Sequence, residues 1–506
     1  MATKPIVLIV LDGWGHREEL RDNAIAQAAT PYYDSLLNDF PHALLEASEE
    51  AVGLPEGQMG NSEIGHMTIG AGKIIDTDLV KIAKAIRNNE FGQNAAFLQL
   101  FEHVKQHDSF LHVMGLLSHG GVHSHEDHLH AFLRAAKDAG ITKIVMHVFT
   151  DGRDTAPQSA ADNLKLLEDL ISDLGVGFIA TASGRFYAMD RDKNWDRLGK
   201  FEHVLFGDMP EHAIDQPATN RKPSEVYREL YAQGGLDEHV TPMVFLDETG
   251  KSYQISDRDG IFFFNFRADR ARQLAAKVKE RAQARDLLFV TMTEYDEAVP
   301  TLVAYPKSAI KTTLAAEISK AGYKQAHIAE TEKYAHATFF LNGGRNEPHE
   351  NETFVLVESR KDVLTHDLAP KMKAKEITNK AIEQLDAGVD FMFINYANAD
   401  MVGHTANVPA IIESVQEVDE QLKRIVAATT DKNGLVIITA DHGNAELNID
   451  PDTGVKHTAH TLNVVPVIMT NKDLKVHGGS LADIAPTILT LMDVPVPLEM
   501  TGKPLI

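Results

Sequence analysis

The stretch IVLIVLDGWG, residues 6–15, contains the pattern on which much of the chain is built. Its apolar run, rich in β-branched residues, stops abruptly at Asp12, as is typical of a strand buried on both faces of a parallel sheet. The run is too short for the apolar segment of a signal peptide, and no later run reaches a membrane-spanning length. We therefore expect a soluble, cytoplasmic protein.

Apolar runs of the same kind recur along the whole chain. They occupy residues 110–117, 143–149, 177–181, 261–266, 287–292, 390–396, 435–439 and 464–469. Helical-looking segments separate many of them, so the predicted fold class is α/β, with largely parallel sheets and helices on either side. Asp, His or Arg follow most of the runs, and open α/β sheets bind ligands outside the carboxyl ends of their strands. This arrangement predicts an enzyme.

Bulk composition limits the function classes further. A chain of 506 residues is too long for one hydrophobic core and indicates two or three domains. A net charge of −24 disfavours nucleic acid and anionic membranes as partners, although an arginine cluster in a cleft could still bind a small anion. The absence of cysteine excludes disulfides, thiolate metal sites and a cysteine nucleophile.

The loops after the apolar runs are of two chemical kinds, and their order predicts the domain organisation. Loops rich in Asp and His lie in residues 1–72 and 390–460, whereas arginine-rich loops lie mainly in residues 120–270. We therefore expect one domain that is split in sequence, residues 1–76 and 310–506, with a second α/β domain, residues 77–309, inserted into it.

Four elements of the split domain predict a metal centre. Asp400 and His404 in DMVGH are four residues apart and share a helix face, while DHG and HTAHT follow nearby. Capping of a nearby helix would explain any single Asp–His pair. Several Asp and His residues that follow buried strands favour a metal site instead. The candidate ligands are Asp12, Asp400, His404, Asp441, His442 and His460. Carboxylate and imidazole favour Mn²⁺ or Zn²⁺, and six ligands are too many for one catalytic ion, so we expect two ions.

Ser62 lies in the small-residue stretch MGNSEIGHMTIGAG, residues 59–72. One interpretation is a tight turn entering a helix, with Asn61 or Ser62 as the N-cap. The other is a nucleophile at a helix start, where backbone N–H groups favour an arriving phosphate. A paired metal site would lower the pKa of the Ser62 hydroxyl, and it therefore supplies the activator that the second interpretation needs.

Longer motifs carry a family resemblance. LDGWG (11–15), MGNSEIGH (59–66), ADHGNAE (440–446) and HTAHT (457–461) resemble the alkaline phosphatase superfamily. TDGRD (150–154), SGRFYAMDRD (183–192) and NFRADRAR (265–272) narrow the resemblance to the cofactor-independent (2,3-bisphosphoglycerate-independent) phosphoglycerate mutases, essentially end to end. One departure is NVVP at 463–466, where the family usually has NPVP.

The resemblance implies an alkaline-phosphatase-like, doubly wound domain that carries two Mn²⁺ ions per chain, with Zn²⁺ or Co²⁺ as alternatives. Matched by motif, Asp400, His404 and His460 would hold one ion. Asp12, Ser62, Asp441 and His442 would hold the other. His457 stays outside this set, with a structural or supporting role.

The arginines independently favour a phosphorylated carboxylic acid as substrate, because a guanidinium fork matches carboxylate and phosphate oxygens. Those in loops after strands are Arg153, Arg185, Arg191, Arg267 and Arg270, whereas Arg197, Arg221, Arg228, Arg281 and Arg285 are interpreted as surface charges. Spacing alone does not separate His123 from its neighbours His119, His125, His128 and His130; the family motif selects it. The resemblance likewise places Lys333 near the phosphoryl group and makes Asp154 a hydroxyl ligand.

The implied reaction is the interconversion of 3-phosphoglycerate and 2-phosphoglycerate in glycolysis and gluconeogenesis. Ser62 would become phosphoserine, Asp154 would act as general acid and base, and the inserted domain would exclude water by hinge closure. We expect a monomer. The rivals are a metal-dependent phosphatase or another phosphosugar mutase, and an inactive metal- or phosphometabolite-binding protein.

Overall fold

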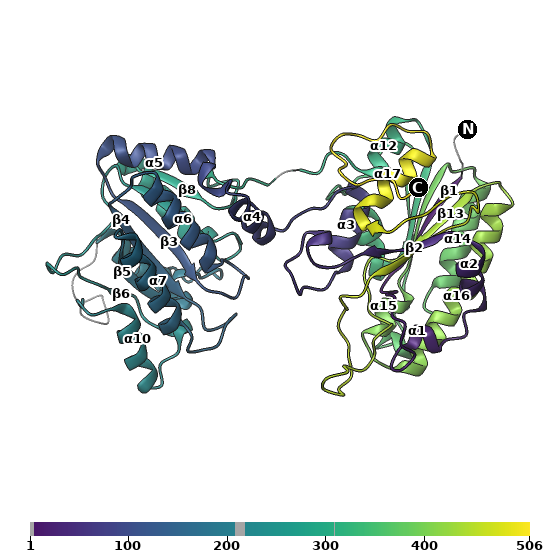
Figure 1. Ribbon diagram of the computed structural model, residues 1–506, viewed down its shortest axis with the longest axis horizontal. Helices are drawn as coiled ribbons and strands as arrows, with labels where there is room; N and C mark the ends of the chain where they lie inside the picture. Colours follow the sequence, from purple (N-terminus) through teal and green to yellow (C-terminus); the bar gives the residue numbers. More distant parts are fainter. Residues whose placement is uncertain (1–4, 208–217, 308) are drawn as a thin grey trace. The chain divides into compact units, whose positions relative to one another are not determined.

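The computed structural model describes residues 5–207, 218–307 and 309–506, and the chain forms two compact units (Figure 1). The first unit comprises Met1–Thr77 and Ala309–Ile506, and the second comprises Asp78–Ser308. Each unit has its own sheet and its own hydrophobic core. The α/β fold class predicted from the apolar runs is confirmed.

The sheet of the first unit has eight strands among the described residues. Their order is β11 (Glu352–Val357), β10 (Gln325–Glu330), β12 (Phe391–Tyr396), β1 (Ile6–Leu11), β13 (Leu435–Thr439), β14 (Val465–Met469), β2 (His42–Glu46) and β15 (Gly479–Ser480). Neighbours are parallel, except that β14 is antiparallel to both β13 and β2. The carboxyl ends of β10, β12, β1 and β13 therefore share one edge of the sheet.

Helices cover both faces of this sheet (Figure 1). One side carries α2 (Pro31–Asp39), α14 (Ala374–Asp386) and α16 (Val408–Thr430), and the other carries α3 (Ser62–Ala71), α12 (Leu314–Lys320) and α17 (Ile484–Leu491). The shorter helices are α1 (Ala24–Gln27), α13 (Thr331–Ala335), α15 (Asn398–Gly403), 3₁₀ turns at Glu49–Val52, His366–Leu368 and Leu481–Asp483, and a π-helix at His336–Phe340.

The sheet of the second unit has seven strands in the described part of the chain. Their order is β6 (Met243–Val244), β5 (Phe178–Gly184), β4 (Ile144–Thr150), β3 (Leu111–Leu117), β7 (Gly260–Phe263), β8 (Leu288–Thr291) and β9 (Leu302–Val303). All neighbours are parallel except β5 and β6. This sheet too gathers its loops at one edge.

Strand β3 shows why this second sheet is covered on both faces. Leu111 and Val113 belong to one core cluster, whereas Met114 and Leu116 belong to another, as the two-residue period of a strand requires. The first cluster includes α4 (Asp78–Arg87), α5 (Ala95–His107), α6 (Glu126–Asp138), α7 (Ala160–Leu174) and α10 (Pro223–Ala232). The second cluster includes α9 (Trp195–Phe206) and α11 (Arg272–Arg285). Short turns complete the unit: α8 (Arg185–Ala188), Phe91–Gln93 and Asp237–His239.

The nine apolar runs of the sequence all contain strands, but several strands lacked a clear signal. Strand β10 reads QAHIAE, so its polar residues conceal a fully buried strand. Strand β11 is half-exposed along its middle, and β6, β9 and β15 have only two residues each. The run at 464–469 forms β14, which pairs antiparallel with both neighbours although the pattern favoured parallel pairing. No helix in the described ranges is long and apolar enough to cross a membrane.

Candidate functional site

Four neighbouring strands of the first unit bring the predicted metal ligands to one edge of the sheet. Asp12 directly follows β1, and Asp441 and His442 follow β13. Asp400 lies in α15, which begins two residues after β12. Lys333 lies in α13, which begins directly after β10. Residues that are distant in sequence therefore converge because their strands are parallel neighbours.

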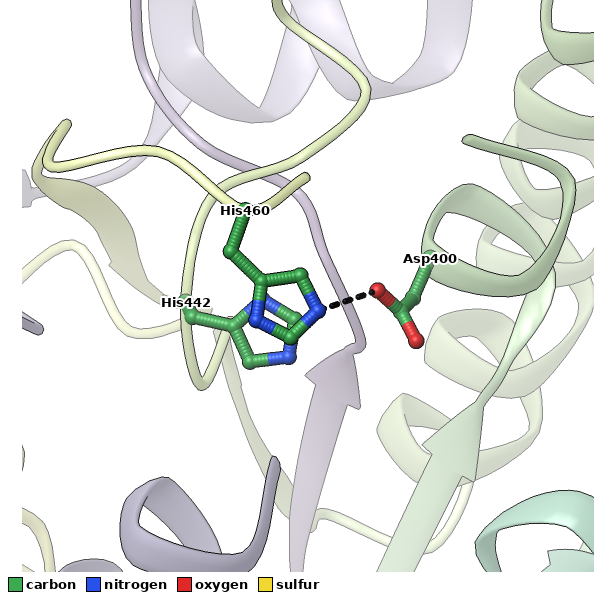
Figure 2. Close-up of side chains that lie close together, drawn as sticks. All are labelled: Asp400, His442 and His460. Carbon is green, nitrogen blue, oxygen red and sulfur yellow. Dashed lines mark ion pairs between the residues drawn. The ribbon is translucent and has the colours of Figure 1, made fainter. Parts of the chain in front are cut away.

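The carboxylates and imidazoles form two overlapping groups of mutually close ligand atoms. One group joins Asp400, His442 and His460, and the other joins Asp12, Asp441 and His442, with all ligand atoms of a group within 4.8 Å of one another. Figure 2 shows the first group: His460 Nε2 lies 3.2 Å from Asp400 Oδ1, and the rings of His442 and His460 stack. The sequence predicted all five of these residues as ligands.

His404 lies beside the first group rather than within it. Its Nε2 is 3.3 Å from Asp400 Oδ1 and 3.3 Å from His460 Nε2. Its side chain is 42 % exposed, and its Nδ1 lies 2.8 Å from the backbone oxygen of Thr458. His457 is not part of either group.

Ser62 is the first residue of α3, and Asn61 is the N-cap, accepting a hydrogen bond from the backbone N–H of Ile64. This resolves the choice between Asn61 and Ser62 as the cap and leaves the serine hydroxyl available. Ser62 Oγ lies 3.3 Å from Asp12 Oδ1 and 3.0 Å from His442 Nε2. The hydroxyl is therefore within reach of two predicted metal ligands and at the positive end of a helix dipole.

Lys333 places its ammonium among the carboxylates. Its Nζ lies 2.6 Å from Ser62 Oγ, 2.7 Å from Asp12 Oδ1 and 2.6 Å from Asp400 Oδ2. Burial lowers the pKa of Lys333, but the charges of Asp12 and Asp400 outweigh burial and raise it above its ordinary value. The lysine is therefore held charged next to the serine hydroxyl.

The three carboxylates differ in the balance between burial and neighbouring charge. Burial raises the pKa of Asp12, and the nearby charge of Asp441 raises it further. Burial opposes ionisation of Asp400 as well, but Lys333 and the hydrogen bonds from His404 and His460 lower its pKa well below its ordinary value. The pKa of Asp441 is also lowered, because His442 and His66 outweigh burial. Stable ionisation of all three carboxylates requires more positive charge than Lys333 provides.

This donor set fits divalent cations. Three buried carboxylates, imidazole nitrogens and a serine hydroxyl lie together, and the chain has no thiolate. Asp441 Oδ2 is buried and has no hydrogen-bond partner among the described residues at normal geometry. Carboxylate and imidazole ligands without thiolate suit Mn²⁺, Zn²⁺ or Co²⁺.

The second unit gathers the predicted arginines around a core of carboxylates. Arg185 is buried, and its Nη1 lies 2.6 Å from Asp151 Oδ1 and 2.5 Å from Asp154 Oδ2. Asp269 pairs with Arg191 at 3.3 Å and with Arg267 at 3.0 Å. The sequence singled out neither Asp151 nor Asp269, although Asp151 directly follows β4 and carried the same strand-end signal as Asp12.

His123 lies between the carboxylates of Asp154 and Asp269. Its Nε2 is 3.8 Å from Asp154 Oδ2, and its Nδ1 is 3.5 Å from Asp269 Oδ1. Burial, followed by the positive charge of Arg185, lowers the pKa of His123 to about 4. The imidazole is therefore neutral at neutral pH.

A cavity of about 300 Å³ lies beside these side chains. It is lined by Arg153, Arg185, Phe186, Asp190, Asp192, Arg197, Glu238, His239 and Arg270. Burial and the nearby charges of Arg191, Arg185 and Arg153 lower the pKa of Arg270, which shows that positive charge is concentrated here. A small anion would relieve that repulsion.

Arg197 corrects one interpretation of the sequence. It was assigned to the surface, but it lines this cavity, pairs with Asp190 at 3.0 Å and lies 3.7 Å from the centre of the Phe186 ring. Its position in a helix, away from any strand end, gave no signal. The other four arginines assigned to the surface pair with acidic residues or carbonyls outside this cavity.

Buried polar residues of the first unit complete the site, and the sequence did not single them out. Glu446 accepts hydrogen bonds from the backbone of Gly15 and Asn444 and from the side chains of Thr461 and Asn463, so it joins the loops that carry the predicted ligands. His66 and Asn395 lie between Asp12 and Asp441. His66 stands one helical turn after Ser62, a spacing that could have indicated it.

Comparisons with known proteins agree on one family. A family model for the metalloenzyme superfamily matches residues 4–496. The 2,3-bisphosphoglycerate-independent phosphoglycerate mutase of Chloroflexus aggregans is 46 % identical over 99 % of this chain and 98 % of its own length. That of Clostridium botulinum is 45 % identical over the full length of both chains, and enzyme 1 of Methanosarcina acetivorans is 46 % identical over 100 % and 99 %.

A solved structure supports the same relationship. Leishmania mexicana phosphoglycerate mutase, determined at low cobalt concentration, is 27 % identical and aligns with a TM-score of 0.54. The alignment covers 99 % of this chain and 98 % of that one. The likeness therefore extends over both units.

Proposed function

The chain belongs to the metalloenzyme superfamily and, within it, to the 2,3-bisphosphoglycerate-independent phosphoglycerate mutases, and on this premise we propose how its residues carry out the reaction. The protein is a metal-dependent isomerase that interconverts 3-phosphoglycerate and 2-phosphoglycerate. The observation that carries the mechanism is the convergence of Asp12, His442 and Lys333 on the hydroxyl of Ser62.

We assign the metal ligands to two Mn²⁺ ions per chain. Asp400, His404 and His460 would hold one ion, and Asp12, Ser62, Asp441 and His442 would hold the other. The close approach of His442 to both ligand groups is consistent with neighbouring ions. When bound, the ions lower the pKa of the serine hydroxyl and offset negative charge on the phosphoryl group. Zn²⁺ or Co²⁺ could take the same places.

Ser62 attacks the phosphorus of the substrate in line and becomes phosphoserine, while the hydroxyl oxygen of the glycerate leaves. Lys333 is held charged beside Ser62 Oγ, so it stabilises negative charge on the transferring oxygens. The backbone N–H groups in the first turn of α3 point out of the N-terminal end of the helix, which is the positive end of its dipole. This end of the helix therefore attracts the negatively charged phosphoryl group to Ser62. Return of the phosphoryl group to the other hydroxyl of glycerate completes the reaction.

Glycerate is bound by the arginine cluster of the second unit. Arg185, Arg191, Arg267 and Arg270 hold the phosphate and carboxylate ends, and His123, Arg153 and Asp154 position the hydroxyls. The ion pair between Asp154 and Arg185 holds the carboxyl group in place beside His123. Asp154 is therefore the proposed general acid and base at the two hydroxyls. Neutral His123 can donate or accept a hydrogen bond beside it.

All the proposed catalytic and binding residues come from one chain, so we propose that a monomer is active. The reaction uses a small phosphorylated acid, and the proposed location is the cytoplasm. Neither nucleic acid nor a membrane has a role in this mechanism.

The test uses the metal-reconstituted full chain, 3-phosphoglycerate and no 2,3-bisphosphoglycerate. Phosphorus NMR should show 2-phosphoglycerate, and mass spectrometry of acid-quenched enzyme should find phosphate on Ser62. Ser62→Ala should abolish transfer and retain most of the bound metal, whereas Ser414→Ala, a buried serine in α16, should stay active. Net release of inorganic phosphate would instead indicate a phosphatase, and mutase activity in Ser62→Ala would exclude the phosphoserine route.

A further inference from the structure

Two buried residues of the first unit, neither of them a predicted metal ligand, connect the predicted metal ligands to one another. His66 lies in α3, one turn after Ser62, and Asn395 is the penultimate residue of β12. Both are fully buried. Asn395 Nδ2 lies 2.8 Å from Asp12 Oδ2 and 3.0 Å from His66 Nε2. The amide therefore links the carboxylate to the imidazole.

The other side of the imidazole reaches the second carboxylate. His66 Nδ1 lies 2.8 Å from the backbone oxygen of Ser62 and 3.2 Å from Asp441 Oδ2. Hydrogen bonds thus connect Asp12 to Asn395 and Asn395 to His66, and a close contact at 3.2 Å, without hydrogen-bond geometry, extends from His66 to Asp441. The same path contacts the first residue of α3, whose side chain is the proposed nucleophile.

Hydrogen-bonding chemistry fixes the direction of each bond in this path. Asp12 has only acceptors when ionised, so the amide nitrogen of Asn395, rather than its oxygen, must face it. The second N–H of the same nitrogen then donates to His66 Nε2, which must carry a lone pair. With Nε2 as the acceptor, His66 Nδ1 is the donor to the backbone oxygen of Ser62, and it also lies 3.2 Å from Asp441 Oδ2.

Asn395 is specific for this role. Its Oδ1 is buried and has no hydrogen-bond partner among the described residues, so only the nitrogen holds the amide in place. A buried acceptor of this kind costs about 1–3 kcal/mol, and an apolar residue would avoid that cost. The presence of asparagine at this position is explained if both N–H groups of its side-chain amide are needed.

We propose that His66 and Asn395 act together as positioning residues: a polar bridge that orients the carboxylate of Asp12 through a hydrogen bond and that of Asp441 through a close contact, both toward a divalent cation, and aligns Ser62 with them. This inference rests on the proposed function. Bridges of this type orient ligands before the metal arrives, and their loss typically weakens metal binding about 10- to 100-fold.

The first unit contains a matched control network with no predicted metal ligand. His327 Nδ1 lies 2.9 Å from the backbone oxygen of Ala337 and 3.4 Å from Glu352 Oε1, and Asn342 Nδ2 donates to the same Glu352 oxygen at 2.9 Å. His327 and Asn342 are also buried. Their substitution removes the same kinds of contact from the core but leaves the candidate site intact.

The experiment measures Mn²⁺ binding to metal-free full chain by calorimetry, independently of turnover, and then kcat and KM at saturating Mn²⁺. His66→Gln and Asn395→Ala should weaken Mn²⁺ binding about 10- to 100-fold and lower kcat with little change in KM. The control variants His327→Gln and Asn342→Ala should lower the melting temperature to a similar extent, yet keep Mn²⁺ affinity within about twofold of the unsubstituted chain.

The double variant H66Q/N395A tests whether the two residues act as a unit. It should bind Mn²⁺ about as tightly as the weaker single variant, because the first substitution already breaks the bridge. Asn395→Leu provides a second test if the alanine variant unfolds, and it should weaken Mn²⁺ binding because it removes both N–H donors while nearly keeping the side-chain volume. Native Mn²⁺ affinity in folded His66 and Asn395 variants, or equal loss in the controls, would overturn the proposal.

These outcomes are separable from failure of the proposed function. If the unsubstituted chain converts 3-phosphoglycerate and Ser62→Ala does not, the proposed route stands whatever the bridge variants do. If Ser62→Ala remains active, the serine route fails, although the effect of the bridge on Mn²⁺ affinity can still be measured.

Discussion

Each of the two clusters of charged residues lies at the carboxyl ends of parallel strands within its own unit, but their solvent exposure differs sharply. In the first unit, the carboxylates of Asp12, Asp400 and Asp441 are at most 2 % exposed. In the second unit, the side chains of Arg153, Arg191 and Arg267 are 53 %, 48 % and 50 % exposed. Short, buried carboxylates hold a fixed geometry that suits cations, whereas long guanidinium side chains at the surface can adjust to a small anion.

Because of this difference in exposure, substitutions in the two clusters should affect different properties of the protein. Burying several like charges is unfavourable unless cations compensate, so the first cluster is expected to be sensitive to loss of any member. Exposed arginines remain hydrated, so removal of one should affect substrate binding more than folding. Four predictions test this contrast, beginning with the largest expected effect.

Asp441→Asn should have the most severe consequence, because it removes a buried negative charge while keeping the side-chain size. We expect kcat/KM to fall on the order of 10³-fold, with weakened Mn²⁺ binding. Asp419→Asn is the matched control, since Asp419 is buried in the same unit and accepts hydrogen bonds from the backbone of Tyr32 and Tyr33. Initial-rate measurements compare the two variants. If Asp441→Asn lost less activity than Asp419→Asn, the predicted sensitivity of the buried carboxylate cluster would be wrong.

Glu330 is a buried carboxylate of the first unit with no ion-pair partner among the described residues, so it shows what burial does without a cation. Burial, with a smaller contribution from Glu332, raises its pKa from 4.5 to about 7. Because the folded-state pKa lies above the unfolded value, ionisation opposes folding. This penalty is absent below pH 4.5, grows as the pH rises toward 7 and is fully present above that range.

Glu330→Gln should therefore stabilise the metal-free chain at pH 8, by up to about 3 kcal/mol, and have an effect below about 1 kcal/mol at pH 5. Melting curves at the two pH values measure the difference. Glu332→Gln, at an exposed position nearby, should stabilise the chain at pH 8 less than Glu330→Gln does, because Glu332 makes only the smaller contribution to the raised pKa. An equal effect of Glu330→Gln at both pH values would show that ionisation of the carboxyl is not responsible.

Arg191→Gln should raise KM for 3-phosphoglycerate about 10-fold while leaving the melting temperature and Mn²⁺ affinity near their original values. The exposed guanidinium pairs with Asp269, and its loss removes one contact to the anionic substrate. Arg221→Gln removes a comparably exposed arginine that pairs with Glu229 away from the cavity, and its KM should not change. Steady-state kinetics with both variants decide the point.

Salt should produce the smallest effect. Raising NaCl from 50 to 500 mM should increase KM a few-fold, because exposed arginines are screened, whereas ion pairs within the buried cluster are screened much less. The melting temperature of metal-free chain should accordingly change little. A KM that is independent of salt would indicate that the arginine cluster is shielded from solvent when substrate binds.

The sequence by itself determined the elements and much of the chemistry. Continuous apolar runs predicted nine of the strands, because a strand buried on both faces is usually built mostly from apolar residues. Asp12, Asp441 and Arg185 were found because they stand at strand ends, where open α/β sheets bind ligands. The roles assigned to these residues, and to the two parts of the chain, stay proposals.

Only the tertiary structure decided which of these ends meet. The order of the strands places Asp12 beside Asp400 and Asp441. Strand β10, which the apolar pattern did not predict, places Lys333 next to Ser62. The bridge of Asn395 and His66 left no clear mark on the sequence. The physical reason is that the apolar pattern of a strand reflects its own burial and can be read within one segment. Contacts between polar side chains of different strands depend on strand order and register, which no single segment encodes.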